Sequence, residues 1–277
     1  MKIKEEIITS RKNPSVMLAS SLLEKKYRDR EGLFRTDGIK LAREAFSKGA
    51  DVQLVMLRKS SLASLEGILE NAPNFDAIVL EDSVFDKISE EKSPEGIICI
   101  IKHLDNFKKI ATIDNRELFF SSLAQGRTLI LESLRDPGNL GTVIRSAAAL
   151  KVKNIVISSD CADVYNPKSL RASMGGVFGV SIYSFASLLP VIHGIREFGG
   201  RVFAAALDRD AERLDALTVK HGDVFAIGNE GHGLSRELID ACDRSVFIPI
   251  SDGSESLNAS AAAAIILWEQ MRQLEIK

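Results

Sequence analysis

The sequence predicts an α/β protein, in which a mostly parallel sheet with helices on both faces is joined to a smaller N-terminal α/β domain. Short apolar runs alternate with amphipathic stretches along the whole chain, as strands alternate with helices in this class. In the second half, helices separate the expected strands, which favours parallel pairing and burial of both sheet faces. The 277 residues, 45% apolar and 27% charged, suffice for one large domain or two ordinary ones.

The N-terminal part is expected to form one compact α/β unit. Its apolar patterns predict helices over 14–26, 39–47, 61–70 and 84–88. They predict strands over 32–35, 52–57, 77–80 and 97–101. The stretch that follows is mixed and polar. We therefore assign residues 1–108 to a first domain and residues 109–127 to a linker.

Residues 128–277 are expected to form the second domain. Strands are predicted over 128–132, 154–157, 179–182, 201–205, 223–227 and 244–248. Helices are expected to begin near Asn139, Pro167, Ser187, Ser235 and Ser256. Ligands of parallel sheets bind at the carboxyl ends of the strands, so the loops after these strands are where a site is expected.

Composition excludes several classes of protein. The three cysteines are far apart and form no CxxC pair, and the four histidines share no ligand spacing. We therefore expect no disulfide framework and no metal site, and a reducing, cytoplasmic location fits. The charged N-terminus does not resemble a signal peptide. No apolar run reaches the ~18–20 residues needed to cross a bilayer, so no membrane segment is expected.

Charge is unevenly distributed along the chain. Residues 1–43 hold 11 Lys and Arg against 6 Asp and Glu, while the whole chain carries a net charge of −2. A basic front on an acidic body can steer a polyanion to one end. An ordinary solvated helix face explains the same charges equally well, and the sequence leaves both interpretations open.

The first candidate loop is LRDPGNLGTVIRSAAAL, residues 134–150. A turn at Pro137–Gly138 precedes Asn139, which we expect to cap a helix whose apolar face packs on the sheet. Arg145 lies among small residues one turn inside that helix, where an anion such as phosphate is favoured. An arginine that extends from the helix edge to solvent is the alternative interpretation.

Two further loops follow later strands. AIGNEGHGLSREL contains Gly228, Gly231 and Gly233 around the carboxylate of Glu230, and it matches neither the GxxxxGK[ST] nor the GxGxxG pattern. FIPISDGSESLNASAAAAIILWEQM leads into an alanine-rich helix that Ser256 or Asn258 is expected to cap. Polar, glycine-containing loops after three strands indicate one site assembled at one edge of a sheet.

These residues resemble a known family. NLGTVIRSA, GNEGHGLS and IPISDGSESLNASAAAA are similar, in order and spacing, to the three motifs of the SpoU/TrmH family of RNA ribose 2′-O-methyltransferases. NPKSLRASMGG resembles a family segment between the first two motifs. The likeness runs from Thr128 to the C-terminus. It departs at Ser254 and Ala259, where the family often has valine, and in residues 179–182, which lack the proline often seen there.

The resemblance implies a knotted (trefoil) fold that binds S-adenosylmethionine and forms a homodimer with the site near the subunit interface. Local patterns alone would not predict a knot, because knotted chains are rare. The segments GLFRTDGIKLAREA and SPEGIICI make the first domain similar to the ribosomal-protein-like, substrate-binding domain of one branch. This favours ribosomal RNA over tRNA as the substrate, by family analogy.

The resemblance also assigns residues. Arg145, Asn139, Glu230, Ser256 and Asn258 match the catalytic positions of the three motifs. The residues that match the cofactor-binding segments are Leu207, Gly228, Asn229, Gly231, Ile248, Ile250 and Leu257. No metal is implied. Methylation of tRNA, or RNA binding without catalysis on the same scaffold, are the alternatives. An ordinary dinucleotide-binding enzyme is disfavoured because no glycine-rich fingerprint follows any strand.

Overall fold

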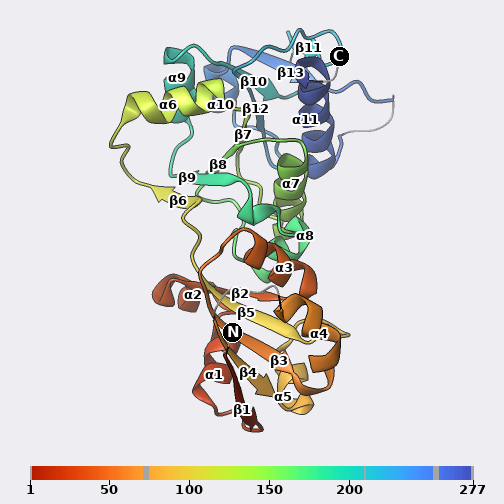
Figure 1. Ribbon diagram of the computed structural model, residues 1–277. Coiled ribbons are helices and arrows are strands. Elements are labelled where there is room, and N and C mark those ends of the chain that lie inside the picture. The colour runs from red at the N-terminus through yellow and green to blue at the C-terminus, as the bar shows by residue number, and fades with distance from the viewer. Residues whose placement is uncertain (1, 71–74, 209, 252–255, 276–277) are drawn as a thin grey trace. The chain divides into compact units, whose positions relative to one another are not determined.

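The computed structural model describes residues 2–70, 75–208, 210–251 and 256–275. Contacts between residues divide the chain into two compact units (Figure 1). The first comprises Met1–Asp105 and Asp163–Phe178, and the second comprises Asn106–Ala162 and Gly179–Lys277. The second unit is therefore interrupted by a segment that packs with the first, which the sequence pattern did not indicate.

The first unit is built on a mixed five-stranded sheet with the strand order β1-β4-β3-β5-β2. Its strands are β1 (Lys2–Ile8), β2 (Leu33–Asp37), β3 (Val52–Arg58), β4 (Asp76–Leu80) and β5 (Ile97–Lys102). Its helices before residue 105 are α1 (Pro14–Ser21), α2 (Lys25–Glu31), α3 (Ile39–Ser47), η1 (Lys59–Ser61), α4 (Leu62–Leu69) and α5 (Asp82–Ile88). Apolar side chains of α1 and α5 pack on β3, β4 and β5 to form a buried core.

The single helix expected over 14–26 is wrong, because the chain turns between α1 and α2. Arg28 explains the break. Its Nη1 donates to the carbonyl oxygens of Leu22 and Leu23 at 2.8 and 2.7 Å, and these carbonyls thereby gain partners that a continuous helix would otherwise supply. Strand β1 and the helical turn η1 were not predicted, whereas α3 begins and ends where the pattern placed it.

Residues 163–178 belong to the first unit and contain α8 (Pro167–Ser173) and η2 (Gly176–Phe178). The Tyr165 ring stacks on Phe34 and on His103, with centroids 4.5 Å apart in both pairs. The Tyr165 hydroxyl accepts from the backbone N–H of Leu104 at 2.7 Å. Arg28 pairs with Asp163 at 2.7 Å, and both side chains are largely buried. Aromatic stacking and a buried ion pair thus attach this segment to the sheet of the first unit.

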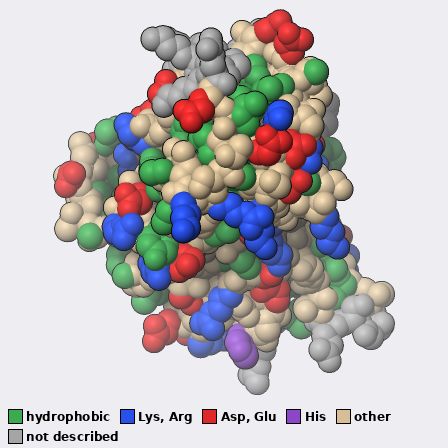
Figure 2. Space-filling view, turned by 90° about the horizontal axis from the view of Figure 1, so that it is seen from below, with side chains coloured by type: hydrophobic (Ala, Val, Ile, Leu, Met, Phe, Trp, Pro, Cys, Tyr) green, Lys and Arg blue, Asp and Glu red, His purple; other side chains and the backbone are tan. Residues whose placement is uncertain are grey.

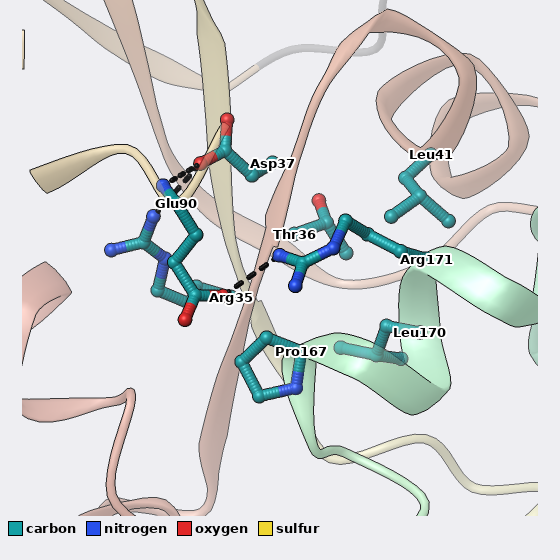
Figure 3. A pocket seen from close by; sticks show the side chains of 8 residues that line it. All are labelled: Arg35, Thr36, Asp37, Leu41, Glu90, Pro167, Leu170 and Arg171. Atoms are coloured by element: carbon teal, nitrogen blue, oxygen red, sulfur yellow. Dashed lines mark hydrogen bonds and ion pairs between the residues drawn. The ribbon is translucent and has the colours of Figure 1, made fainter. Parts of the chain in front are cut away.

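A small cavity lies where α8 meets β2 and α3 (Figure 3). The Arg35 guanidinium pairs there with the Asp37 carboxylate at 3.1 Å, and Arg171 pairs with Glu90 at 2.8 Å. Burial lowers the pKa of Arg35, an effect that the Asp37 charge opposes. The cavity volume of about 10 Å³ is that of a single water molecule, so the cavity is too small to admit a substrate.

The second unit is built on an eight-stranded sheet, within the described residues, in the order β11-β13-β10-β12-β7-β8-β9-β6. The strands are β6 (Phe107–Ile110), β7 (Thr128–Leu131), β8 (Asn154–Ser158), β9 (Ser181–Phe185), β10 (Arg201–Ala205), β11 (Glu212–Arg213), β12 (Asp223–Ile227) and β13 (Arg244–Phe247). Every neighbouring pair is parallel. The predicted parallel sheet is confirmed, and all its carboxyl ends share one edge.

Helices cover both faces of this sheet (Figure 1). They are α6 (Arg116–Gln125), α7 (Pro137–Ala149), α9 (Leu189–Glu197), α10 (Arg236–Ala241) and α11 (Ala259–Glu275). Apolar side chains of α6, α9 and α10 form one core with β7, β8, β10 and β12. Helices α7 and α11 lie together on the opposite face (Figure 1). The face of α7 predicted to be apolar is buried, as expected.

The stretch 109–127, expected to be a linker, contains α6 and the end of β6, which pairs with β9. Phe120 and Leu123 of this stretch pack into the core. Polar residues surround them in the sequence, so the pattern did not predict a buried helix. The three cysteines are free. In the part of the chain that the structure describes, we find no helix with the length and apolarity needed to span a bilayer.

Candidate functional site

The three candidate loops leave the sheet at its carboxyl edge. Residues 132–136 connect β7 to α7, and residues 228–235 connect the adjacent strand β12 to α10. Residues 248–258 connect β13 to α11, and Ser254 of this loop lies outside the described residues. The parallel topology therefore delivers all three loops to the edge at which ligands of such sheets bind.

Three polar side chains, one associated with each loop, form a hydrogen-bonded cluster. The Nδ2 of Asn139 donates to Glu230 Oε1. The Nδ2 of Asn258 donates to Asn139 Oδ1 at 3.1 Å. We call Asn139, Glu230 and Asn258 the polar cluster. Its members are 91 and 119 residues apart along the chain, so only the fold brings them together.

Helix caps explain how two of these side chains are presented. The prediction that Asn139 caps α7 is wrong: Asp136 is the N-cap, and its Oδ1 accepts from the Asn139 N–H at 2.8 Å. Because Asp136 takes that role, the Asn139 amide is free to bond to the other two loops. Asn258 does cap α11, because its Oδ1 accepts from the N–H groups of Ser260 and Ala261 at 2.9 and 3.3 Å.

The loop that carries Glu230 is closed by backbone bonds and requires glycine at its start. Asn229 and Gly233 exchange backbone hydrogen bonds of 3.0 and 2.8 Å. A Cβ on Gly228 would lie 2.1–2.3 Å from backbone atoms of Gly233 and Leu234, so no other residue fits. Gly233 has φ +68°, a conformation that favours glycine.

The loop after β7 contains a strained residue that neighbouring loops hold in place. Ser133 has φ 55°, in the left-handed region that a residue with a Cβ rarely adopts. Its N–H donates to Ser158 Oγ at 2.8 Å and its carbonyl accepts from Asn229 Nδ2 at 2.9 Å. Its hydroxyl donates to Asp160 at 2.6 Å. Backbone strain persists where surrounding contacts determine it, and such positions concentrate at functional sites.

Arg145 is exposed on α7, and it makes no hydrogen bond or ion pair with the residues that the structure describes. It follows Asn139 by six residues, about 9 Å along the helix axis. Leu140, Val143 and Ile144 are buried against the sheet beside it. The helix thus presents an unpaired guanidinium on its open side, but the structure does not bring Arg145 into the polar cluster.

The other predicted site residues differ in exposure. Ser256 is exposed and makes no hydrogen bond with described residues. Leu207 after β10 and Ile250 after β13 are large apolar side chains with exposed fractions of 85% and 39%. Gly228 is buried, whereas Gly231 is exposed. The remaining predicted cofactor positions are half-buried: Asn229, Ile248 and Leu257.

A cavity of about 190 Å³ lies next to these loops. Its lining includes Glu132, Ser133, Ser158 and Asp160, at the carboxyl ends of β7 and β8, and it extends to the start of α10. None of these four residues was predicted from the sequence. Each of them ends or follows an apolar strand, and this position at the carboxyl end of a strand is the sequence feature that could have predicted them. Among the described residues, no group of His, Cys, Asp and Glu is arranged to hold a metal ion.

Comparison with known proteins gives consistent results for both units. Residues 126–268 match the SpoU rRNA Methylase family, and residues 13–99 match the MRM3-like substrate binding domain. The chain is 27% identical over 263 residues to the 23S rRNA (guanosine(2553)-2′-O)-methyltransferase RlmP of Bacillus subtilis, covering 94% of this chain and 97% of that protein.

Two solved structures are similar over nearly the whole chain. The AdoMet-bound rRNA methyltransferase from Sinorhizobium meliloti has a TM-score of 0.82 and 25% identity, with 98% of each chain covered. The SpoU methyltransferase AviRb from Streptomyces viridochromogenes, in complex with AdoMet, has a TM-score of 0.79 and 25% identity, with 95% of this chain and 98% of that chain covered.

Proposed function

Because the chain belongs to the SpoU rRNA methylase family, we propose that it transfers a methyl group from S-adenosylmethionine to a ribose 2′-hydroxyl in ribosomal RNA. The observation that carries this proposal is the polar cluster of Asn139, Glu230 and Asn258, assembled from three loops at the carboxyl edge of the sheet. A protein that only bound RNA would not require these three side chains to meet at one point.

The residues at this edge fit the methyl donor. Leu207 and Ile250 offer exposed apolar side chains, and the backbone near Gly228, Ile248 and Leu257 offers hydrogen-bonding groups. Pockets for cofactors combine apolar contact with a few polar groups in this way. Asn229 and Gly231 would hold the intervening loop around the ligand. When bound, S-adenosylmethionine supplies an electrophilic methyl group.

Arg145 is the residue to which we assign the main electrostatic role. Its guanidinium is exposed and unpaired among the described residues, so it is available to bind the phosphate next to the reacting ribose. The same positive charge would stabilise the negative charge that develops on the 2′-oxygen as its proton is lost. The planar fork of N–H donors on a guanidinium also suits hydrogen bonding to an anion.

The polar cluster would orient the ribose. Asn139 already uses its amide to join Glu230 and Asn258, so a ribose hydroxyl that reached this point would meet both donors and acceptors. Ser256, with its hydroxyl free among described residues, is assigned to the same task. Orientation of a weak nucleophile toward a bound electrophile can lower a barrier by several kcal/mol.

Ribosomal RNA is favoured over tRNA as the substrate. The N-terminal unit matches a substrate binding domain, and two full-length relatives described above are named as ribosomal RNA methyltransferases. On the face shown in Figure 2, Lys and Arg side chains gather near the centre, interspersed with acidic ones. Local groups of cations can contact phosphates although the whole chain is slightly acidic.

The test is transfer of labelled methyl groups from S-adenosylmethionine to total RNA from cells that lack the gene, followed by mapping of the modified nucleotide. We expect label on a ribose 2′-oxygen of ribosomal RNA. Label on tRNA would move the proposal to the tRNA alternative. RNA binding without any transfer would leave a binding protein on this scaffold.

We further propose that the catalytic unit is knotted and that it forms a homodimer. Helix α11 carries Ile265 and Trp268 at 40% and 49% exposure, and a second copy of the chain would cover these apolar side chains. Trp268→Glu should then lower the sedimentation coefficient to that of a monomer. The three free cysteines suit a reducing compartment, and we propose the cytoplasm.

A further inference from the structure

We propose that Glu132 is a positioning residue, which holds the loop 228–235 in the register that brings Glu230 to Asn139. The proposal rests on the proposed function, because its main readout is methyl transfer. Glu132 is the first residue after β7, and it is half-buried beside the 190 Å³ cavity. It touches neither Asn139 nor Glu230 through any hydrogen bond, so its effect on them must pass through the loop.

Both oxygens of the Glu132 carboxylate bind the end of this loop. Oε2 accepts from the Ser235 backbone N–H at 2.6 Å, and Oε1 accepts from the Ser235 hydroxyl at 2.7 Å. Hydrogen bonds to an ionised group are short and about twice as strong as neutral ones. Ser235 in turn caps α10, since its Oγ accepts from the Leu238 N–H at 3.3 Å.

The backbone of Glu132 binds the other end of the same loop. Its N–H donates to the carbonyl oxygen of Ile227, the last residue of β12, at 2.9 Å. One residue therefore holds both ends of the loop, at Ile227 and at Ser235. Between them, Asn229 Nδ2 donates to the carbonyl of the next residue, Ser133, at 2.9 Å. Glu230 follows Asn229 directly, so its position depends on these attachments.

This geometry predicts a catalytic effect without direct contact. If Ser235 loses its partner, the loop end is free to shift, and the Glu230 carboxylate moves relative to Asn139. A misplacement of about 1 Å can cost about 100-fold in rate, even when the altered residue does not touch the substrate. A carboxylate that merely capped α10 would instead change stability and leave the turnover of folded protein unchanged.

The experiment compares kcat for methyl transfer to RNA among Glu132→Ala, Glu132→Gln, Ser235→Ala and the double variant Glu132→Ala/Ser235→Ala. Glu237→Ala is the matched control. It removes a carboxylate from the first turn of α10 that makes no hydrogen bond with described residues. All rates are measured below the melting temperature of each variant, on protein shown to be folded by circular dichroism.

We expect Glu132→Ala to lower kcat about 100-fold. Glu132→Gln should recover most of that loss, because its amide can still accept from the Ser235 N–H and donate to Oγ. The double variant should be no slower than Glu132→Ala, since Glu132→Ala already removes both hydrogen bonds to Ser235 and Ser235→Ala removes one of the same two. Unchanged kcat in Glu132→Ala, a similar loss in Glu237→Ala, or additive losses in the double variant would each overturn the proposal.

Hydrogen exchange separates this inference from the proposed function. If the unaltered chain transferred no methyl group to any RNA, the function would be wrong, and the attachment of the loop would still be measurable. Amides 229–234 should then exchange faster in Glu132→Ala than in the unaltered chain, and at the unaltered rate in Glu237→Ala. Equal exchange in all three proteins would overturn the positioning role.

Discussion

Arg145 is the residue on which the proposed chemistry depends most. Arg145→Ala should lower kcat about 100- to 1,000-fold, the usual loss when one stabilising donor is removed. Affinity for S-adenosylmethionine, measured by calorimetry, should change little, because the cofactor positions proposed above lie on other loops. A matching loss of donor affinity would assign Arg145 a structural role.

Arg135 provides the matched control for that substitution. It carries the same charge on the loop before α7, it is 72% exposed, and its ion pair with Asp160 spans 3.3 Å. Arg135→Ala should raise KM for RNA modestly through lost phosphate attraction and leave kcat within a few fold. Equal kcat losses in both variants would show that only overall charge matters.

Gly228 tests whether the glycine loop has the geometry described. In Gly228→Ala the new Cβ would meet backbone atoms of Gly233 and Leu234 at 2.1–2.3 Å, and backbone cannot move aside cheaply. We expect a loss of about 1–3 kcal/mol in the free energy of unfolding, measured in urea. In Gly231→Ala the nearest atom is Asn229 Oδ1 at 3.4 Å, so the loss should stay within about 0.5 kcal/mol.

The meeting of Asn139, Glu230 and Asn258 at one edge of the sheet was predictable from sequence, whereas the contacts that hold their loops were not. Turn residues after predicted strands indicated the loops that contain Asn139, Glu230 and Asn258, and the resemblance to the SpoU/TrmH motifs assigned these residues to one site. Glu132 acts through Ser235, 103 residues away, and no local pattern encodes such a pair. The cap of α7 was misassigned for a related reason: Asp136 and Asn139 are both good caps, and only the backbone path decides between them.

At the scale of elements, the strands inside both sheets and the edge strand β2 were predicted, whereas the edge strands β1, β6 and β11 were missed. Strands β10 and β12 are apolar after a charged first residue, Arg201 and Asp223, and they matched their expected bounds. Strands β1 and β6 lie at sheet edges, and their sequences KIKEEII and FKKI are rich in charge. Lysine on an edge strand prevents pairing with other chains. The same charges interrupt the apolar run by which a strand is otherwise recognised in a sequence.

The ion pair between α2 and the 163–178 segment gives the prediction at this scale. Arg28 and Asp163 are 3% and 16% exposed, and Arg28→Ala would leave a buried carboxylate without its cation. We expect a loss of about 3–5 kcal/mol in the free energy of unfolding. The control Arg30→Ala removes an exposed arginine two residues away, and it should cost less than about 1 kcal/mol. Similar melting temperatures for the two variants would contradict the burial of this pair.

At the scale of the molecule, the chain alternates between the two units, so removing the N-terminal residues alone does not remove one whole unit. Three chain crossings connect them, after Asp105, Ala162 and Phe178. A domain joined by one linker can be removed without harm to its neighbour. Here, a deletion of the N-terminal residues up to Asp105 would leave residues 163–178 behind in the catalytic unit, although these residues belong to the N-terminal unit. The sequence did not reveal this division, because α8 lies between two strands of the parallel sheet and looks like any crossover helix.

The last prediction concerns that truncation. A chain of residues 106–277 would expose the apolar side of the 163–178 segment, including Tyr165, Leu170 and Phe178, all buried in the full chain. We expect it to bind a hydrophobic dye, to aggregate, and to lose cooperative melting. Replacing residues 163–178 by a Gly/Ser linker should restore solubility, because the exposed apolar surface is then gone. If residues 106–277 alone melted cooperatively as a soluble species, the segment would not depend on the first unit. RNA binding by the N-terminal unit is therefore better tested with surface substitutions than by deletion, since a deletion would alter the catalytic unit as well.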